Sequence, residues 1–171
     1  VVWGSWFGDQ LPAGNPNNVQ FTLSIHADVT NGVLAPWSMP GTNLWLATFL
    51  PGQFNVAEEK TGLQEGWLTP PNQYVWPGDN ICYEYDFKID PSVAFVQTNG
   101  NIYWLDVQAR RNGTQTNVLF GWKTSITNWN DDSVWANGTE PWFGPWQELR
   151  RWWQPPASPS IDLAFRLATE E

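Results

Sequence analysis

The sequence predicts an all-β fold, namely a single-domain antiparallel β-sandwich of jelly-roll type with about eight strands and one long tryptophan-rich loop. Three observations lead to this prediction. Several segments alternate apolar and polar residues with the period of two that is typical of half-buried strands. Gly and Pro, 14 of each, punctuate a chain that is 16% aromatic. The length of 171 residues suits one domain, so we expect residues 1–171 to fold together.

The first predicted strand covers residues 1–7 and leads into a turn region rich in Gly, Pro and Asn at 8–18. Residues 19–29 alternate clearly. Apolar side chains on one face are Val19, Phe21, Leu23, Ile25 and Ala27, and polar side chains on the other are Gln20, Thr22, Ser24, His26 and Asp28. This pattern predicts a strand with one face in the core and one in water, which would place His26 at the surface.

The later strands follow from the same signals. Residues 43–50 are apolar on both faces and predict a central strand, whereas 80–89 alternate again. Residues 101–111 and 115–123 flank Asn112-Gly113, a strong signal for a hairpin with a type I′ turn. Residues 158–169 form the last predicted strand, and only 147–153 could hold a short helical turn.

Composition excludes several classes of partner. The chain carries 8 Lys and Arg against 17 Asp and Glu, a net charge of −9. Phosphate backbones and anionic membranes are bound through clustered Lys and Arg, so we expect neither as a partner. The apolar runs are much shorter than the roughly 18–20 residues that span a bilayer, so we expect no membrane insertion. Cys82 is the only cysteine, which excludes an intrachain disulfide.

A tryptophan-rich segment is the strongest functional signal. Half of the 14 tryptophans fall between residues 122 and 153, and the intervening 124–146 predict a long structured loop because they are rich in Asn, Asp, Gly and Pro. Long loops in compact domains are often functional. The flat indole face suits stacking on a sugar ring, and short polar side chains suit its hydroxyl groups.

We therefore predict that this loop binds polysaccharide. The candidate stacking residues are Trp129, Trp135, Trp142 and Trp146, and the candidate hydroxyl ligands are Asn130, Asp131, Asp132 and Glu140. The alternative is that these indoles pack as the loop's own core, as Trp122 is expected to do because it lies on a strand.

Metal and catalytic signals are weaker. Asn130-Asp131-Asp132 could hold Ca²⁺, which takes six to eight oxygen ligands, but the spacing of a calcium loop is absent and Asx turns explain the cluster equally well. No other cofactor is expected. His26 is the sole histidine, and no Gly-x-Ser-x-Gly motif occurs. Asp106, within an apolar strand, is either a buried hydrogen-bond acceptor or one of two catalytic carboxylates. The sequence favours a non-catalytic protein over a glycan-active enzyme.

Six sequence blocks support a family resemblance over essentially the whole chain. They are Trp3-Gly4-Ser5-Trp6, Phe21-Thr22-Leu23-Ser24-Ile25-His26, Gly100-Asn101-Ile102-Tyr103-Trp104-Leu105, Phe120-Gly121-Trp122-Lys123-Thr124, Trp129-Asn130-Asp131-Asp132 and Ile161-Asp162-Leu163-Ala164-Phe165. With them the chain resembles a domain of unknown function that recurs in secreted and surface proteins of planctomycete-type bacteria. The resemblance implies an extracellular or cell-surface β-sandwich with no assigned catalytic residues.

The chain departs from the family's pattern at its start. A strand containing Asp-Asp-Phe precedes the Trp-Gly-Ser-Trp block in the family, whereas this sequence begins after that point. Either the sequence has been shortened at this point or the sheet lacks a strand, and a sandwich lacking an edge strand exposes unpaired backbone groups that another chain can occupy. The alternative function is therefore a structural or adhesive cell-surface subunit that self-associates through an open sheet edge or Trp-rich interfaces.

Overall fold

The computed structural model confirms the all-β class. It describes all residues except 113–116, 128–129, 138–143, 151–160 and 169–171. The described part contains thirteen strands, every pairing between them is antiparallel, and the only helical elements are the short 3-10 turns η1 (Phe7–Asp9) and η2 (Pro12–Gly14). In these residues no helix is long and apolar enough to cross a membrane.

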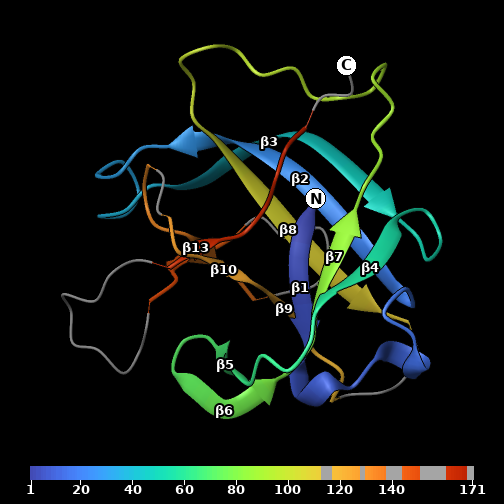
Figure 1. Ribbon diagram of the computed structural model, residues 1–171. Helices are drawn as coiled ribbons and strands as arrows, with labels where there is room; N and C mark the ends of the chain where they lie inside the picture. Colours follow the sequence, from blue (N-terminus) through green and yellow to red (C-terminus); the bar gives the residue numbers. More distant parts are fainter. Residues whose placement is uncertain (113–116, 128–129, 138–143, 151–160, 169–171) are drawn as a thin grey trace.

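Two sheets form the sandwich-like body (Figure 1). The first contains, in spatial order, β4 (Asn55–Lys60), β7 (Cys82–Asp86), β1 (Val2–Trp6) and β9 (Phe120–Trp122). The second contains β3 (Met39–Phe49), β2 (Val19–Val29) and β8 (Tyr103–Arg111). The central β2 pairs with both neighbours, so that Phe21 lies opposite Phe49 on one side and Ala109 on the other.

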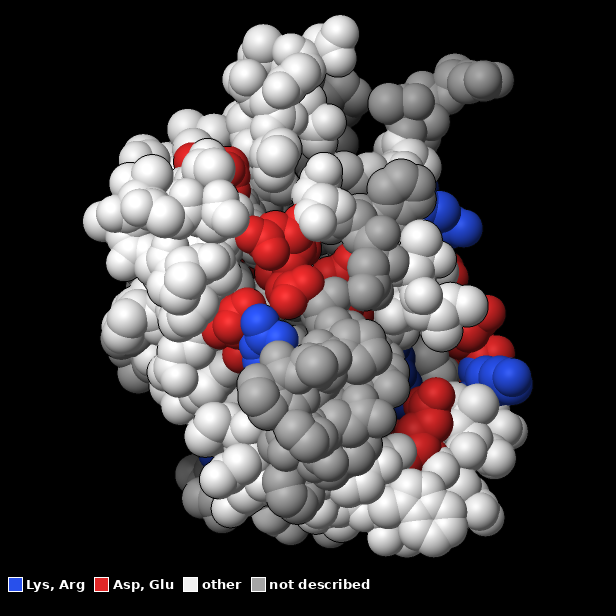
Figure 2. Space-filling view, turned by 90° about the vertical axis from the view of Figure 1, so that its left-hand side faces the viewer, with Lys and Arg blue, Asp and Glu red and all other residues white. Residues whose placement is uncertain are grey.

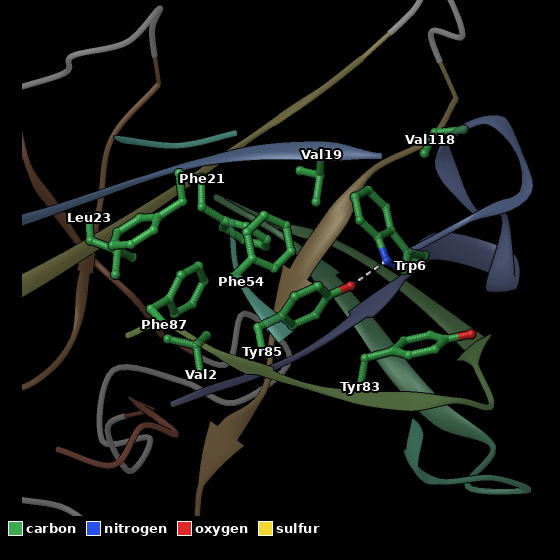
Figure 3. Packing of buried hydrophobic residues seen from close by; sticks show 11 residues of the cluster. Val2, Trp6, Val19, Phe21, Leu23, Phe54, Tyr83, Tyr85, Phe87 and Val118 are labelled. Carbon is green, nitrogen blue, oxygen red and sulfur yellow. Dashed lines mark hydrogen bonds between the residues drawn. The ribbon is translucent and has the colours of Figure 1, made fainter. Parts of the chain in front are cut away.

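The hydrophobic core lies between these sheets and is built largely from aromatic rings (Figure 3). The ring of Phe21 lies 5.0–5.3 Å, between centroids, from four others, those of Phe54, Tyr85, Phe87 and Phe120. Trp6 Nε1 donates a hydrogen bond of 2.9 Å to the buried Tyr85 hydroxyl. Burial strongly raises the pKa of Tyr85, so this phenol stays neutral and can accept that bond.

Three two-stranded ribbons complete the described strands. They are β5 (Glu65–Thr69) with β6 (Gln73–Asp79), β10 (Thr124–Ser125) with β13 (Asp162–Leu163), and β11 (Val134–Trp135) with β12 (Gln147–Glu148). The β5–β6 hairpin extends from one end of the body in Figure 1, and the indole of Trp67 packs against Phe7 at 5.3 Å. The ribbons β10–β13 and β11–β12 are built from the chain that follows β9.

Two predictions about individual strands are wrong. The segment 43–50 is not central, because β3 lies at the end of its three-stranded sheet in the described part of the chain and exposes Leu44 (45%) and Leu46 (42%). Residues 113–116 of the hairpin expected across Asn112-Gly113 lie outside the described part, but the described strands on either side, β8 and β9, belong to different sheets and do not pair with each other. Strand β8 pairs with β2 over nine register positions and β9 pairs with β1, so these two strands take partners that are distant in sequence.

The predicted position of His26 is wrong as well. Its side chain is completely buried, although it lies on the polar face of β2 as the alternation predicted. The indole of Trp146 packs edge-on against the imidazole, with 6.2 Å between ring centroids. A segment that follows β9 in the sequence therefore covers the polar face of β2, which the sequence pattern assigned to solvent. The helical turn considered at 147–153 begins instead with the strand β12, and its last three residues lie outside the described part.

Candidate ligand-binding cleft

A cleft of about 1100 Å³ opens along β8. One wall is β8 itself, and the opposite walls come from β10, β11 and β13 together with the segment just before β3. Figure 2 shows the side of the molecule on which β10 and β13 lie, where acidic side chains gather near the middle of the surface. The cleft thus brings together segments far apart in the sequence.

Among the described residues, five indoles line this cleft: Trp3, Trp104, Trp122, Trp135 and Trp146. The first four are half-buried, which leaves part of each ring accessible. Trp104 Nε1 donates to Asp28 Oδ1 at 2.8 Å, and Trp122 Nε1 donates to the Ala164 carbonyl at 2.7 Å. These bonds hold the two rings in fixed orientations, so the cleft is preorganised for a flat apolar partner.

Trp146 differs from the other four indoles. It is only 9% exposed and lines both the cleft and a smaller cavity of about 500 Å³ next to it. Its indole N–H is buried and has no hydrogen-bond partner in the part of the chain that the structure describes. A buried donor of this kind is costly unless water or a ligand satisfies it.

Four carboxylates also line the cleft: Asp28, Asp106, Asp131 and Asp162. Asp106 Oδ2 accepts hydrogen bonds from Gln108 Nε2 at 2.6 Å and from the Ser24 hydroxyl at 3.3 Å. Gln108 lines the cleft too, so this wall presents an amide beside a carboxylate. The described lining contains neither Lys nor Arg, so its charged side chains are all acidic.

Asp131 ties the loop to the second sheet. Its Oδ2 accepts the Ser38 backbone N–H at 2.9 Å, and its Oδ1 accepts the Asp132 N–H at 2.8 Å. Burial raises the pKa of Asp131, but hydrogen bonds from Ser38 and Asp132 and the nearby charge of Arg150 outweigh it and hold the pKa below its ordinary value. The carboxylate is therefore ionised at neutral pH and acts as an acceptor.

A buried polar chain lies behind the β8 wall. His26 Nδ1 is 3.0 Å from the Gly41 carbonyl, which can only accept, so Nδ1 carries a hydrogen. His26 Nε2 is 3.0 Å from the Ser24 hydroxyl, which also contacts Asp106. Although Ser, His and Asp meet here, Ser24 is only 1% exposed and does not line the cleft. The arrangement supports the cleft wall and does not present a nucleophile to a ligand.

The structure brings some of the sequence-predicted site residues together. Asn130, Asp131, Trp135 and Trp146 line the cleft. Asp132 is not part of the lining; its carboxylate lies 3.9 Å from the Arg150 guanidinium. Trp129, Trp142 and Glu140 lie outside the described residues.

Sequence reasoning singled out Asp106 on β8, which lines the cleft, but missed most of the other strand residues of the cleft. Trp3, Trp104, Asp28 and Gln108 come from three different strands, and Trp122 lines the cleft while also packing against the core. The alternation along 19–29 did place Asp28 on the polar face of its strand. Linking it to Trp104 needed the β2–β8 register, in which His26 lies opposite Trp104.

Metal binding by Asn130-Asp131-Asp132 stays a prediction. In the described part of the chain no group of three His, Cys, Asp or Glu side chains is arranged to hold a metal ion. Asn130 has a positive φ of 56°, and the Asp131 carboxylate binds backbone N–H groups. Neither bond goes to the N–H two residues on that defines an Asx turn, so the Asx-turn alternative also stays a prediction.

Fold and cleft together define an all-β, sandwich-like domain with an aromatic and acidic cleft at one side. The family model described as a domain of unknown function (DUF7901) matches residues 1–168, and the chain belongs to this family. Searches of curated proteins and of solved structures found no match.

Proposed function

We propose that the protein is a non-catalytic, extracellular or cell-surface module that binds polysaccharide in the cleft along β8. One observation carries the proposal: a single cleft of about 1100 Å³ combines four half-buried indoles with carboxylate and amide groups. Pyranose rings have apolar C–H faces and polar edges, so they match a site in which aromatic faces alternate with hydrogen-bonding groups.

The two kinds of lining have separate roles. Trp104 and Trp135, on β8 and β11, provide stacking surface from different segments that line the cleft. Asp131 and the Gln108–Asp106 pair supply acceptors, and Gln108 also a donor, for sugar hydroxyls. The prediction of Trp135, Asn130 and Asp131 as ligand contacts is retained, and Trp104 is added.

Charge narrows the class of glycan. The chain carries a net charge of −9, and the described cleft lining adds four aspartates without a Lys or Arg. Like charges facing one another across an interface are destabilising. We therefore expect neutral polysaccharides to bind and polyuronates or sulfated glycans to be excluded.

The test is calorimetric titration of the wild type and two tryptophan variants with soluble neutral glucans, mannans and xylans, and with polygalacturonate as the anionic probe. Trp135→Ala removes a cleft indole and should weaken binding about tenfold or more, as truncating an aromatic anchor does. Trp76→Ala is the matched control, because Trp76 is 64% exposed on β6 and does not line the cleft. The absence of any binding glycan, or an equal loss in both variants, would overturn the proposal.

A second candidate is a structural subunit that self-associates through a sheet edge. The observation in its favour is β3, an edge strand of eleven residues in the described part that exposes Leu44 and Leu46. Long edge strands with apolar side chains are templates for pairing with a second chain. Sedimentation of the wild type against Leu46→Lys tests it: concentration-dependent oligomers lost in the variant support assembly, and a monomer at all concentrations excludes it.

A further inference from the structure

A second cluster of polar side chains lies outside the cleft, where the β5–β6 hairpin meets the first sheet. It consists of Ser5, Glu65, Asp79 and Lys123. Glu65 and Asp79 are register partners at the open end of the hairpin, so their carboxylates face the same amine. None of the four residues lines the cleft.

The geometry joins one amine to two carboxylates. Lys123 Nζ lies 2.7 Å from Asp79 Oδ1 and also donates to Glu65 Oε2. The Ser5 hydroxyl donates to the other Asp79 oxygen, Oδ2, at 3.0 Å. The Asp79 carboxyl group is therefore fixed at both oxygens, with the amine nitrogen next to its carbon.

Lys123 and Asp79 are shielded from water, whereas the Glu65 side chain is 43% exposed. Asp79 is 2% exposed and the Lys123 side chain 15%. Trp67 lies close to two neighbouring glycines: a side chain at Gly121 would collide with its ring at 2.6 Å, and one at Gly78 with its Cβ at 2.4 Å. An amine and a carboxyl group are thus held in contact and largely buried.

The resting state is an ion pair. Burial lowers the pKa of Lys123, but the hydrogen bonds and charges of Asp79 and Glu65 outweigh it and hold the pKa above its ordinary value. The charges of Lys123 and Asp79 are nonetheless largely removed from water, which is unfavourable for each ion. A product without these charges would be relieved of that desolvation cost.

We propose that Lys123 and Asp79 condense to form an intramolecular amide bond between Nζ and Cγ, with Glu65 as the proton carrier. The ammonium group first passes one proton to the Asp79 carboxylate, which gives a neutral amine and a neutral acid. The nitrogen lone pair then attacks Cγ while the Ser5 hydroxyl stabilises the oxygen that becomes negative. Glu65 accepts the second proton from nitrogen and returns it to the leaving hydroxyl. An ammonium and a carboxylate become one amide and one water, so no oxidant or other reactant is needed.

Proximity supplies the driving force that free amines and acids lack in water. Groups held in reactive contact reach effective concentrations of roughly 10⁵–10⁸ M, which favours condensation within the folded chain. The bond would join the end of β6 to the residue between β9 and β10, 44 positions further along the chain. It would tie the β5–β6 hairpin covalently to the first sheet.

The first experiment is the intact mass of the purified full chain after several days of incubation in its folded state. The expected mass is lower than the sequence mass by one water. Trypsin cannot cleave after an acylated lysine, so a branched product of 61–88 joined to 112–150 is expected, and fragmentation should place the branch on Asp79. The exposed pair Lys88–Asp86, 3.6 Å apart, is the internal control, and cleavage after Lys88 should be normal.

Two variants test the mechanism. Lys123→Met should retain the full sequence mass, and Glu65→Gln should slow the loss of water at least tenfold because it removes the proton carrier. Glu58→Gln, on exposed β4, is the matched control and should react like the wild type. An unmodified wild-type mass overturns the proposal irrespective of how the variants fold. A branch at any other carboxylate, or equal rates in Glu65→Gln and the wild type, does so as well.

Discussion

The two faces of β2 are both buried, but they are filled in different ways. One face presents Val19, Phe21 and Leu23 to the aromatic core between the sheets. The other presents Thr22, Ser24 and His26, which are buried among hydrogen bonds and covered in part by Trp146. The first face is stabilised by removing apolar surface from water, and the second depends on satisfying each buried polar group.

This difference shows what an alternating pattern determines. Alternation fixes which side chains share a face, because successive residues of a strand point in opposite directions. It does not determine what lies against the polar face. In this protein the chain after β9 covers part of that face, so a strand expected to be half in water is buried on both faces.

The largest loss of stability is expected from a substitution on the apolar face of β2. Phe21→Ala removes the ring that lies within 5.3 Å of four other aromatic rings, and should lower the free energy of unfolding by about 3–5 kcal/mol. Urea denaturation followed by circular dichroism measures it. Leu46→Ala, on the exposed face of β3, is the control and should change stability by less than about 0.5 kcal/mol. A loss below about 1 kcal/mol for Phe21→Ala would mean that this face is not a packed core.

A substitution on the polar face of β2 is expected to cause an intermediate loss of stability. Ser24→Ala deprives His26 Nε2 and Asp106 Oδ2 of one hydrogen-bond partner each and should cost about 1–3 kcal/mol. Ser92→Ala is the matched control, because the Ser92 hydroxyl donates to Asp90 on an exposed loop and its loss should be nearly neutral. Urea denaturation followed by circular dichroism measures both changes in the free energy of unfolding. Equal effects of the two substitutions would show that water replaces the lost bonds behind the cleft wall.

The fold class and part of the cleft could be predicted from the sequence, and the physical reasons can be identified. Period-two alternation is local, so it correctly predicted the strand at β2 and the opposite faces of Phe21 and Ser24. The pairing of strands is not local: the Asn112-Gly113 turn signal was strong, yet the register of β8 with β2 determined the sheet. Cleft residues such as Trp104 could not be found from composition because their contribution depends on that register.

The polar cluster around Lys123 could not be predicted for the same reason. Ser5, Glu65, Asp79 and Lys123 are spread over more than 110 positions, and no short motif contains two of them. Only the β5–β6 register and the passage of the chain from β9 to β10 bring them together. In the loop, by contrast, Asp131 could be predicted as a site residue because polar residues and tryptophans lie next to it in the sequence. Its clearest contact is nevertheless to the distant Ser38.

The smallest expected effect is on the stability of the loop that Asp131 holds, and this effect depends on pH. The pKa of Asp131 is below its ordinary value of 3.8 in the folded protein, so the ionised form stabilises the native loop. Its contribution is complete above about pH 4, where the unfolded residue is also ionised, and is lost as the pH falls through the lower folded pKa. We expect this contribution to stability to be less than about 1 kcal/mol, because the residue is partly exposed to solvent.

Hydrogen exchange of the Ser38 amide, which donates a hydrogen bond to Asp131, measures this pH dependence. Its protection should fall on acidification, while the amides between β2 and β8 should keep theirs. In Asp131→Asn the Ser38 amide should already exchange faster at neutral pH and lose most of its pH-dependent change in protection, once the intrinsic pH dependence of exchange is removed. Parallel loss of protection at Ser38 and in β2 would mean that the covering chain and the core open as one unit, and the two faces of β2 would then not be separable.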